Sequence, residues 1–278
     1  MRLPEGCHRL LFSASLLVVM TACAQFPTQD HGPASPVNVS NVPNAVPRYE
    51  PKSPYGNSPT YTVNGKTYHV LPSCAGYHER GIASWYGTKF HGSRTSDGDI
   101  YDMYTMTAAS KVLPLPCFVQ VTNLKNGKTA IVKVNDRGPF VANRIIDLSY
   151  AAAARIGMLG RGTALVDVAA VMPGESPKTA IAESSPPAQK TGEAAVGPVG
   201  RPLIFLQVGA FANRSNAEHV LQKLRLAAVT PAFILTEIQN GVTFYKVRIG
   251  PLPDVSRVDT LSAQLQTLGF NDAQVVIP

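Results

Sequence analysis

Asp136 and Arg137 are the residues from which chemistry could start. They follow the β-branched run 129–134, which is typical of a buried strand, and Gly138 and Pro139 then force a turn. A carboxyl group held at a strand end, with its pKa raised, can donate a proton and later take one back. On residue types alone, however, an ion pair that braces the loop is the commoner use of such neighbours.

Length and composition limit the kinds of protein that could carry these residues. The chain has 278 residues, enough for two small domains with linkers, and only 15% of them are charged. Its 23 prolines and 22 glycines indicate a large share of loops. The net charge of +7 suits a polyanionic partner. Nucleic acid, anionic lipid and acidic cell-wall polymer all meet that description, so charge does not choose among them.

The first residues predict export. Arg2 and Arg9 precede an apolar run that ends at Met20 and is too short to span a bilayer, which is typical of a signal peptide over residues 1–22. Cys23 follows two small residues, as in a bacterial lipobox, so we expect it to be the lipid-bearing N-terminus. Ala24 carries no inner-membrane retention signal, which favours the outer membrane. The alternative is an ordinary secreted protein that is cut nearby.

Two cysteines remain after Cys7 leaves with the signal and Cys23 is lipidated. Cys74 and Cys117 form an even pair in an oxidising compartment, and we expect a disulfide between them. Two buried free thiols are the alternative. Neither cysteine belongs to a Cys-x-x-Cys or His-rich cluster, so the sequence predicts no metal site, and it calls for no cofactor.

Composition divides the chain into segments. Residues 23–60 are rich in Pro, Ser and Asn, and we expect them to be a disordered tether. Residues 61–172 form the first domain, opened by a β-hairpin around Asn64-Gly65. Residues 173–200 lack large hydrophobic side chains and are predicted to be a flexible linker, and residues 201–278 form the last domain.

The two domains differ in pattern. The first contains short β-like runs and one apparent helix, which starts near Ser149 and stops at Gly157, so it predicts a small β-barrel. The last contains a weak internal repeat that predicts the order β-α-β-β-α-β, with Ser215 and Glu218 as a helix cap. RNA-binding modules share this order, but the export signal and the missing Gly-Phe-Gly-Phe motif argue against nucleic acid.

A run of motifs then resembles one known family. They are Ala83-Ser84-Trp85-Tyr86-Gly87, Phe90-His91-Gly92, Thr95-Ser96-Asp97-Gly98-Asp99, Met106-Thr107-Ala108-Ala109, Asn135-Asp136-Arg137-Gly138-Pro139-Phe140 and Ile145-Ile146-Asp147-Leu148-Ser149. In type and order they resemble the rare lipoprotein A family. That resemblance implies a double-psi β-barrel and an endolytic lytic transglycosylase. The Leu-Gln-Val-Gly-Ala-Phe and Tyr-Lys-Val-Arg-Ile-Gly-Pro blocks of the last domain resemble a SPOR domain, an RNP-like α+β module that binds glycan strands stripped of stem peptides.

The resemblance also assigns roles. It implies that Asp136 is the essential catalytic aspartate and that Asp99 holds the family's second acidic position, where Glu is usual. Ser110 stands where the family often has His, and Ser cannot titrate near neutrality. These departures keep open a second interpretation, a cell-wall lipoprotein that binds glycan without cleaving it. Asp147, just before the helix, is predicted to satisfy free N–H groups at the helix start.

Substrate contacts are expected in both domains. In the barrel they are Arg137, Trp85 and Tyr86, although a lone Trp at a strand end is more often part of the core. In the last domain strand alternation places Phe205, Gln207, Phe244, Lys246 and Arg248 on the face opposite the helices. The alternative is that this face only meets solvent. The expected partners are peptidoglycan strands, the membrane that holds the lipid, and neighbours in the division machinery, with enrichment at the septum.

Overall fold

The computed structural model describes residues 30–35, 37–175 and 202–278. The predicted signal peptide, Cys23 and most of the predicted linker lie outside the described residues. Within the described ranges, no helix is long and apolar enough to cross a membrane.

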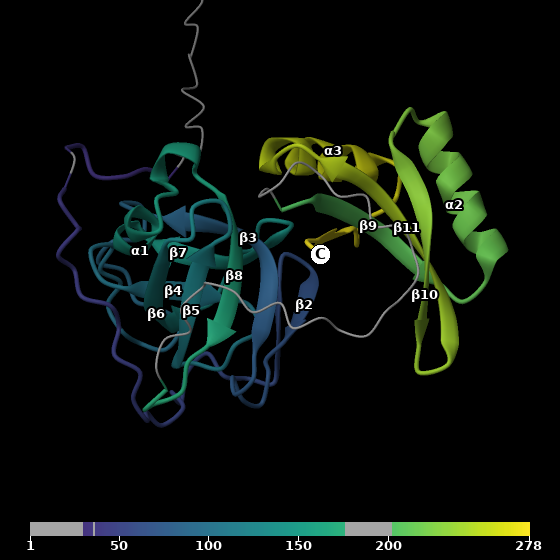
Figure 1. Ribbon diagram of the computed structural model, residues 1–278. Helices are drawn as coiled ribbons and strands as arrows, with labels where there is room; N and C mark the ends of the chain where they lie inside the picture. The colour runs from purple at the N-terminus through teal and green to yellow at the C-terminus, as the bar shows by residue number, and fades with distance from the viewer. Residues whose placement is uncertain (1–29, 36, 176–201) are drawn as a thin grey trace, which may run out of the picture.

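Residues 78–170 close into a barrel with the strand order β3-β7-β4-β6-β5-β8 (Figure 1). The strands are β3 (His78–Tyr86), β4 (Thr107–Ser110), β5 (Cys117–Asn123), β6 (Thr129–Asp136), β7 (Arg144–Ser149) and β8 (Ala164–Ala170). The pairs β3–β7 and β4–β6 are parallel and the other pairs are antiparallel. Alternate apolar side chains such as Val132 and Leu148 fill the interior at 0% exposure. The prediction of a β-barrel is confirmed.

One strand was missed by the sequence pattern. Strand β7 was read as the approach to a helix, because Asp147 interrupts its apolar residues. The helix itself, α1 (Tyr150–Arg155), begins where predicted, with the Ser149 hydroxyl accepting a hydrogen bond from the Ala152 N–H at 3.2 Å. Its C-cap is Ile156, and Gly157 follows with a φ of 71°. A short 3-10 helix, η1 (Leu159–Arg161), follows.

The segment expected to be a free tether lies against the barrel over its described part. Val39 is only 8% exposed, the Ala45 N–H donates to the Ile131 carbonyl at 3.0 Å, and the Leu115 N–H donates to Asn57 Oδ1 at 2.8 Å. The prediction of disorder over residues 23–60 is therefore wrong for this part. The segment has too few apolar residues to form a core of its own, but its polar backbone finds partners on the barrel.

The predicted hairpin follows this segment. Strands β1 (Thr60–Val63) and β2 (Lys66–His69) pair antiparallel. Asn64 and Gly65 connect them at positive φ of 51° and 75°, as a type I′ turn requires.

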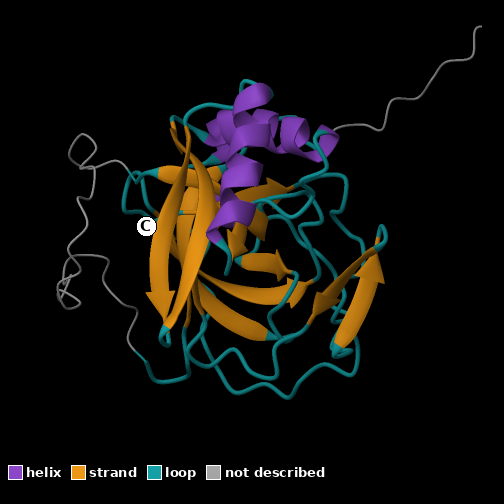
Figure 2. Cartoon of the chain, turned by 90° about the vertical axis from the view of Figure 1, so that its right-hand side faces the viewer, coloured by secondary structure: helices purple, strands orange, loops and turns teal. Residues whose placement is uncertain are grey.

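The C-terminal domain is a sheet with two helices on one face, as Figure 2 shows from the side. The strand order is β10-β11-β9-β12, with β9 (Ile204–Phe211), β10 (Ala232–Gln239), β11 (Val242–Leu252) and β12 (Gln274–Val276). The helices are α2 (Arg214–Leu226) and α3 (Val255–Thr267). The predicted element order is confirmed. The predicted cap of α2 is wrong, because Asn213 is the N-cap and Glu218 instead pairs with Arg214 at 2.8 Å.

The two domains touch along one side of the barrel. Ile82 of β3 is fully buried in the apolar core of the C-terminal domain, and Leu165 packs beside it. Arg144 Nη2 reaches Asp259 Oδ2 on α3 at 2.7 Å, and Asn143 Nδ2 donates to Ser262 Oγ at 2.6 Å. An apolar contact ringed by polar pairs thus holds α3 and β12 against the barrel.

The expected disulfide is not formed. Cys74 and Cys117 are free thiols that contact each other. The hydrogen bond from Cys117 lowers the pKa of Cys74 to about 7 against the effect of burial, and the same contact together with burial raises the pKa of Cys117. Cys74 is therefore the thiol that ionises more readily.

Candidate active site

Asp136 lies at the end of β6 with one carboxylate oxygen fully engaged. Oδ1 accepts hydrogen bonds from the Ser96 N–H at 2.8 Å, the Ser96 hydroxyl at 2.6 Å and the Arg137 N–H at 2.7 Å. Among the described residues, every hydrogen bond that the Asp136 side chain accepts ends at Oδ1. The side chain is therefore fixed in orientation, and Oδ2 is the atom that remains for a substrate.

A second carboxyl group lies level with Asp136 on the barrel. Ala109 on β4 pairs with Asp136 on β6 and, on its other side, with Asp147 on β7. A register shift between Ala108 and Ala109 places Asp136, rather than Asn135, opposite Ala109. Two strand spacings put the backbones of the two acidic residues roughly 10 Å apart, and the charge of Asp136 contributes to the raised pKa of Asp147.

Asp147 is the titrating group of this pair. Burial raises its pKa to about 7, and the charges of Asp30 and Asp136 add to that effect, while a hydrogen bond from Ser84 opposes it. Its Oδ1 is buried and has no hydrogen-bond partner in the described part of the chain. A carboxyl group that holds its proton near neutral pH can act as a general acid.

Sequence reasoning missed Asp147 because it assigned the residue to the helix start. Ser149 does that capping instead, two residues later. The signal that could have found it was a lone acid inside the apolar run Ile145-Ile146-Asp147-Leu148. An acid in a buried strand carries a desolvation cost, and such a cost is seldom retained without a function.

Other polar atoms near this pair also lack partners. The buried Tyr86 hydroxyl adjoins the Thr107 hydroxyl, and neither makes a hydrogen bond of regular geometry to the described residues; the same is true of Asn135 Oδ1. Burial raises the pKa of Tyr86, with the charges of Asp136 and Asp147 adding to it, so the hydroxyl keeps its proton. Unpaired buried polar atoms are rare, and their gathering here indicates a site that a ligand completes.

Asp99 has partners of its own. Its Oδ2 lies 3.0 Å from Lys133 Nζ and 3.2 Å from Asn135 Nδ2. Although partial burial opposes it, these hydrogen bonds lower the pKa of Asp99, so it is ionised at neutral pH. No hydrogen bond or ion pair among the described residues joins it to Asp136. Asp99 lines a cavity of ≈ 570 Å³ together with Thr107, and there it supplies a fixed negative charge.

Arg137 braces the loop. Its guanidinium donates to the carbonyls of Gly56 at 2.9 Å, Ser110 at 3.0 Å and Leu113 at 2.5 Å, and it lies over the Tyr61 ring at 5.7 Å. Among the described residues the expected ion pair with Asp136 is not formed, and Arg137 braces the loop through backbone carbonyls instead. These contacts do not support the predicted role in substrate binding.

Ser110 also serves the local backbone. It is 1% exposed, and its hydroxyl accepts hydrogen bonds from the N–H groups of Val112 at 3.3 Å and Leu113 at 3.2 Å. A residue in this position turns the chain after β4.

The predicted aromatic contacts divide between core and surface. Trp85 packs edge-on against Tyr150 with ring centroids 5.9 Å apart, and the Tyr86 ring is buried and stacked on Tyr101 at 4.1 Å. The exposed ring beside them is Phe90, which is 44% exposed and contacts Tyr86 edge-on at 6.1 Å. Phe90 is therefore better placed than Trp85 or Tyr86 to stack on a sugar ring. The motif Phe90-His91-Gly92 was the sequence signal that could have identified it.

The structure brings the predicted residues of the C-terminal sheet together. Arg248 Nε donates to Gln207 Oε1 at 3.2 Å, and Lys246 Nζ lies 2.7 Å from Glu237 Oε2. Phe205 contacts Phe233 edge-on at 5.9 Å, and Phe244 is paired with Glu237. The opposite side chains Leu206, Val247 and Ile249 are fully buried under the helices, so the predicted division of faces is confirmed.

Known proteins resemble both domains. A family model described as lytic transglycolase matches residues 78–168, and a SPOR domain model matches residues 201–277. The endolytic peptidoglycan transglycosylase RlpA of Pseudomonas aeruginosa is 38% identical over 294 residues, covering 91% of this chain and 85% of that protein. The protein of the same name in Vibrio cholerae is 38% identical, and the match covers 88% of this chain and 86% of that protein. A crystal structure of the SPOR domain of Pseudomonas aeruginosa RlpA is 32% identical, covering 27% of this chain and 99% of that one, with a TM-score of 0.25.

The raised pKa of Asp147 makes stability depend on pH. A carboxyl group whose folded pKa lies above its unfolded value stabilises the fold at low pH, and that contribution is lost as pH rises through about 7. We expect Asp147→Asn to raise the melting temperature at about pH 8, with a gain that shrinks as pH falls toward 4. Thermal melts of the full chain check this, with Asp272→Asn, at a side chain 90% exposed, as the control. An equal shift at every pH would contradict the assignment.

Proposed function

The chain belongs to the RlpA family of endolytic peptidoglycan transglycosylases, and we propose that it cleaves peptide-poor glycan strands with the carboxyl pair Asp136 and Asp147. The observation that carries this proposal is their placement on either side of Ala109, among buried polar atoms without partners. Cleavage and glycan binding reside in separate domains, a lytic transglycosylase barrel and a SPOR domain.

The two carboxyl groups have different roles, one as proton donor and the other as proton acceptor. Asp147 holds a proton near neutral pH and donates it to the glycosidic oxygen as the bond breaks. The sugar then passes through an oxocarbenium-like state, which negative charge nearby stabilises. Asp136 takes the proton of the C6 hydroxyl of muramic acid through its free Oδ2, and the resulting oxygen closes a 1,6-anhydro ring. No water is consumed.

Neighbouring groups support this step. The Tyr86 hydroxyl, kept protonated by its surroundings, can donate a hydrogen bond to a sugar oxygen near the pair. Asp99 adds a fixed negative charge to the adjoining cavity, and Phe90 offers an exposed ring. The alternative remains a protein that binds glycan without cleaving it, which the shorter Asp99 and the non-titrating Ser110 favour.

The open face of the C-terminal sheet is the proposed glycan-binding surface. Phe205 and Phe233 give it an aromatic patch, while Gln207 and Arg248 can donate to sugar hydroxyls and acetamido carbonyls. The SPOR match supports this role. Binding to strands stripped of stem peptides would draw the protein to the division septum.

A lipid on Cys23 is the proposed membrane anchor, with the outer membrane as its site. The support is the sequence alone, a short apolar run and small residues before Cys23 without a retention signal after it.

The first test concerns cleavage. We expect Asp136→Asn and Asp147→Asn each to lower the rate of glycan cleavage by a factor of about 10² to 10⁴, the usual worth of an acid or base. Wild-type activity should fall on the alkaline side with a midpoint of about 7, as Asp147 loses its proton. Release of soluble fragments from peptide-free glycan measures this, with Glu218→Gln, an exposed carboxyl group on α2, as the matched control. Unchanged cleavage in Asp136→Asn would refute the assignment, and an inactive wild type with no gain in Asp99→Glu would favour the binding-only alternative.

The second test concerns the sheet face. The double variant Arg248→Ala, Gln207→Ala removes the donors of that face without touching the buried side, so the melting temperature should hardly change. Its affinity for peptide-free glycan should fall by roughly tenfold or more, and the protein should disperse from division sites. Sedimentation with glycan and fluorescence imaging measure the two effects. Binding and septal position that persist in the folded variant would exclude this face.

The third test concerns the anchor. Cys23→Ser removes the only atom to which the lipid can be attached in the proposed lipobox, so the variant should move from the membrane to the soluble exported fraction. Fractionation of cell envelopes measures this. A variant that stays on the membrane would show that something other than this lipid holds it.

A further inference from the structure

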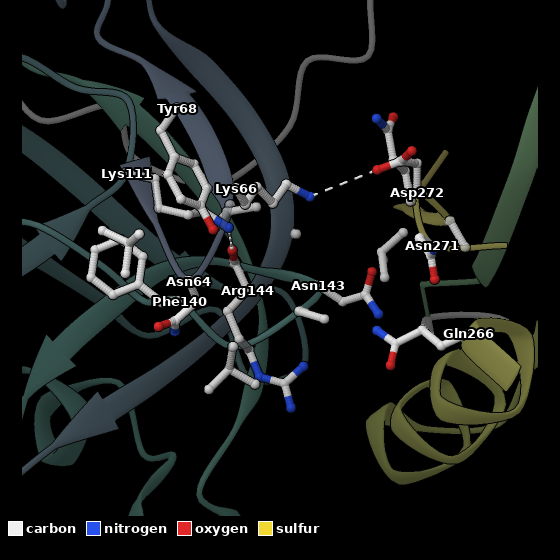
Figure 3. Close-up of a pocket in the computed structure, with 18 of the residues that line it drawn as sticks. Asn64, Lys66, Tyr68, Lys111, Phe140, Asn143, Arg144, Gln266, Asn271 and Asp272 are labelled. Carbon is white, nitrogen blue, oxygen red and sulfur yellow. Dashed lines mark hydrogen bonds and ion pairs between the residues drawn. The ribbon is translucent and has the colours of Figure 1, made fainter. Parts of the chain in front are cut away.

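A groove of ≈ 570 Å³ runs between the barrel and the C-terminal domain (Figure 3). The hairpin, β3, Lys111 and residues 140–145 line it on one side, and Gln266 with residues 271–275 line it on the other. Lys66 of the hairpin reaches across to Asp272 at 3.9 Å, and in the close-up Asn143 and Gln266 point toward each other. Neither domain forms this site alone.

The lining is suited to a sugar chain. Tyr68 and Phe140 place their rings together with centroids 5.6 Å apart, and Phe140 is 39% exposed. Amide side chains surround them: Asn64, Asn143, Gln266, Asn271 and Gln274. Aromatic rings stack on the apolar faces of sugars, and amides both donate to and accept from hydroxyl and acetamido groups.

The groove also holds the ammonium group of Lys111. Lys111 Nζ donates to the Arg144 carbonyl and, in the described part of the chain, makes no ion pair. Burial lowers the pKa of Lys111, and the charges of Lys66 and Arg144 act in the same direction, while the carboxylate of Glu79, which also lines the groove, opposes them. Arg144 Nη1 is buried without a hydrogen-bond partner, while its Nη2 pairs with Asp259. Burial removes part of the hydration of a cation, and an anionic ligand would compensate for that loss.

The groove joins the two surfaces already described. Phe140 belongs to the loop that starts at Asp136, so one end of the groove adjoins the catalytic strand end. Gln274 lines the other end and is paired with Gln207 of the open sheet face. A strand that lay on the sheet face could therefore continue through the groove to the carboxyl pair.

We propose that this groove is a third glycan-binding site, which holds the strand between the sheet face and the catalytic carboxyl groups and recognises its free carboxylates through Lys111. The inference rests on the proposed function for the identity of the polymer. Each muramic acid that has lost its stem peptide exposes a lactyl carboxylate, whereas a peptide-bearing residue has a neutral amide there. Lys111 thus gives the enzyme a direct means of selecting stripped strands.

Binding of uncut strands tests the proposal. The full exported chain, carrying Asp136→Asn so that strands stay whole, is titrated with peptide-free glycan strands and with an N-acetylglucosamine oligosaccharide, which has no carboxylate. Lys111→Met keeps the length of the side chain and removes its charge. Asn271→Ala changes the opposite wall, and Lys125→Met, an exposed lysine outside the groove, is the matched control.

We expect Lys111→Met to weaken binding of peptide-free glycan by about tenfold and to leave the oligosaccharide unaffected. Asn271→Ala should weaken both ligands, and Lys125→Met neither. Wild-type affinity in Lys111→Met and Asn271→Ala would overturn the site. An equal loss on both ligands in Lys111→Met would overturn the recognition of carboxylates. Since these titrations involve no cleavage, they remain decisive even if the wild-type chain proves unable to cut glycan.

Discussion

The register of one short strand determines the candidate active site. Ala109 on β4 pairs in parallel with Asp136 and antiparallel with Asp147, which brings acidic residues of β6 and β7 to either side of one residue. The β4–β6 pairing shifts by one residue between Ala108 and Ala109, and without that shift Asn135 would lie opposite Ala109 in place of Asp136. Because the barrel is closed, every strand has a partner on both sides, and this register is held from both directions. The small side chain of Ala109 leaves the space that a larger residue would fill.

The surrounding contacts hold this arrangement in place. Ser96 and the Arg137 N–H fix one oxygen of Asp136, while the Arg137 guanidinium fastens the segment around Gly56 to the end of β4. Asp30 accepts hydrogen bonds from the N–H groups of Gly87 at 2.7 Å and Lys89 at 3.0 Å, and so positions the loop that carries Phe90. The residues before the barrel therefore contribute to the candidate site. On the far side, α3 and β12 of the C-terminal domain complete a groove that begins at the same catalytic loop.

Periodicity predicted most of the fold, and its failures have physical causes. Alternating apolar residues located the barrel strands on either side of Asn126-Gly127, and Ser149 marked the start of α1 correctly. Strand β7 was not predicted because Asp147 interrupts its apolar pattern. Asp136 was found because it follows a β-branched run and precedes a turn. The role of Arg137 could not be predicted, because its partners are backbone carbonyls far away in the sequence. The packing of residues 37–60 against the barrel could not be predicted either, because it depends on barrel groups that only the folded structure brings near.

The central claim is that the carboxyl pair closes an anhydro ring without water, and the identity of the product tests it most directly. Wild-type protein is incubated with peptide-free glycan in oxygen-18-labelled water, and the new chain ends are analysed by mass spectrometry. Proton donation by Asp147 and attack by the C6 hydroxyl predict 1,6-anhydromuramic ends that carry no label. Reducing ends that contain oxygen-18 would show that water attacks instead, and would contradict the account.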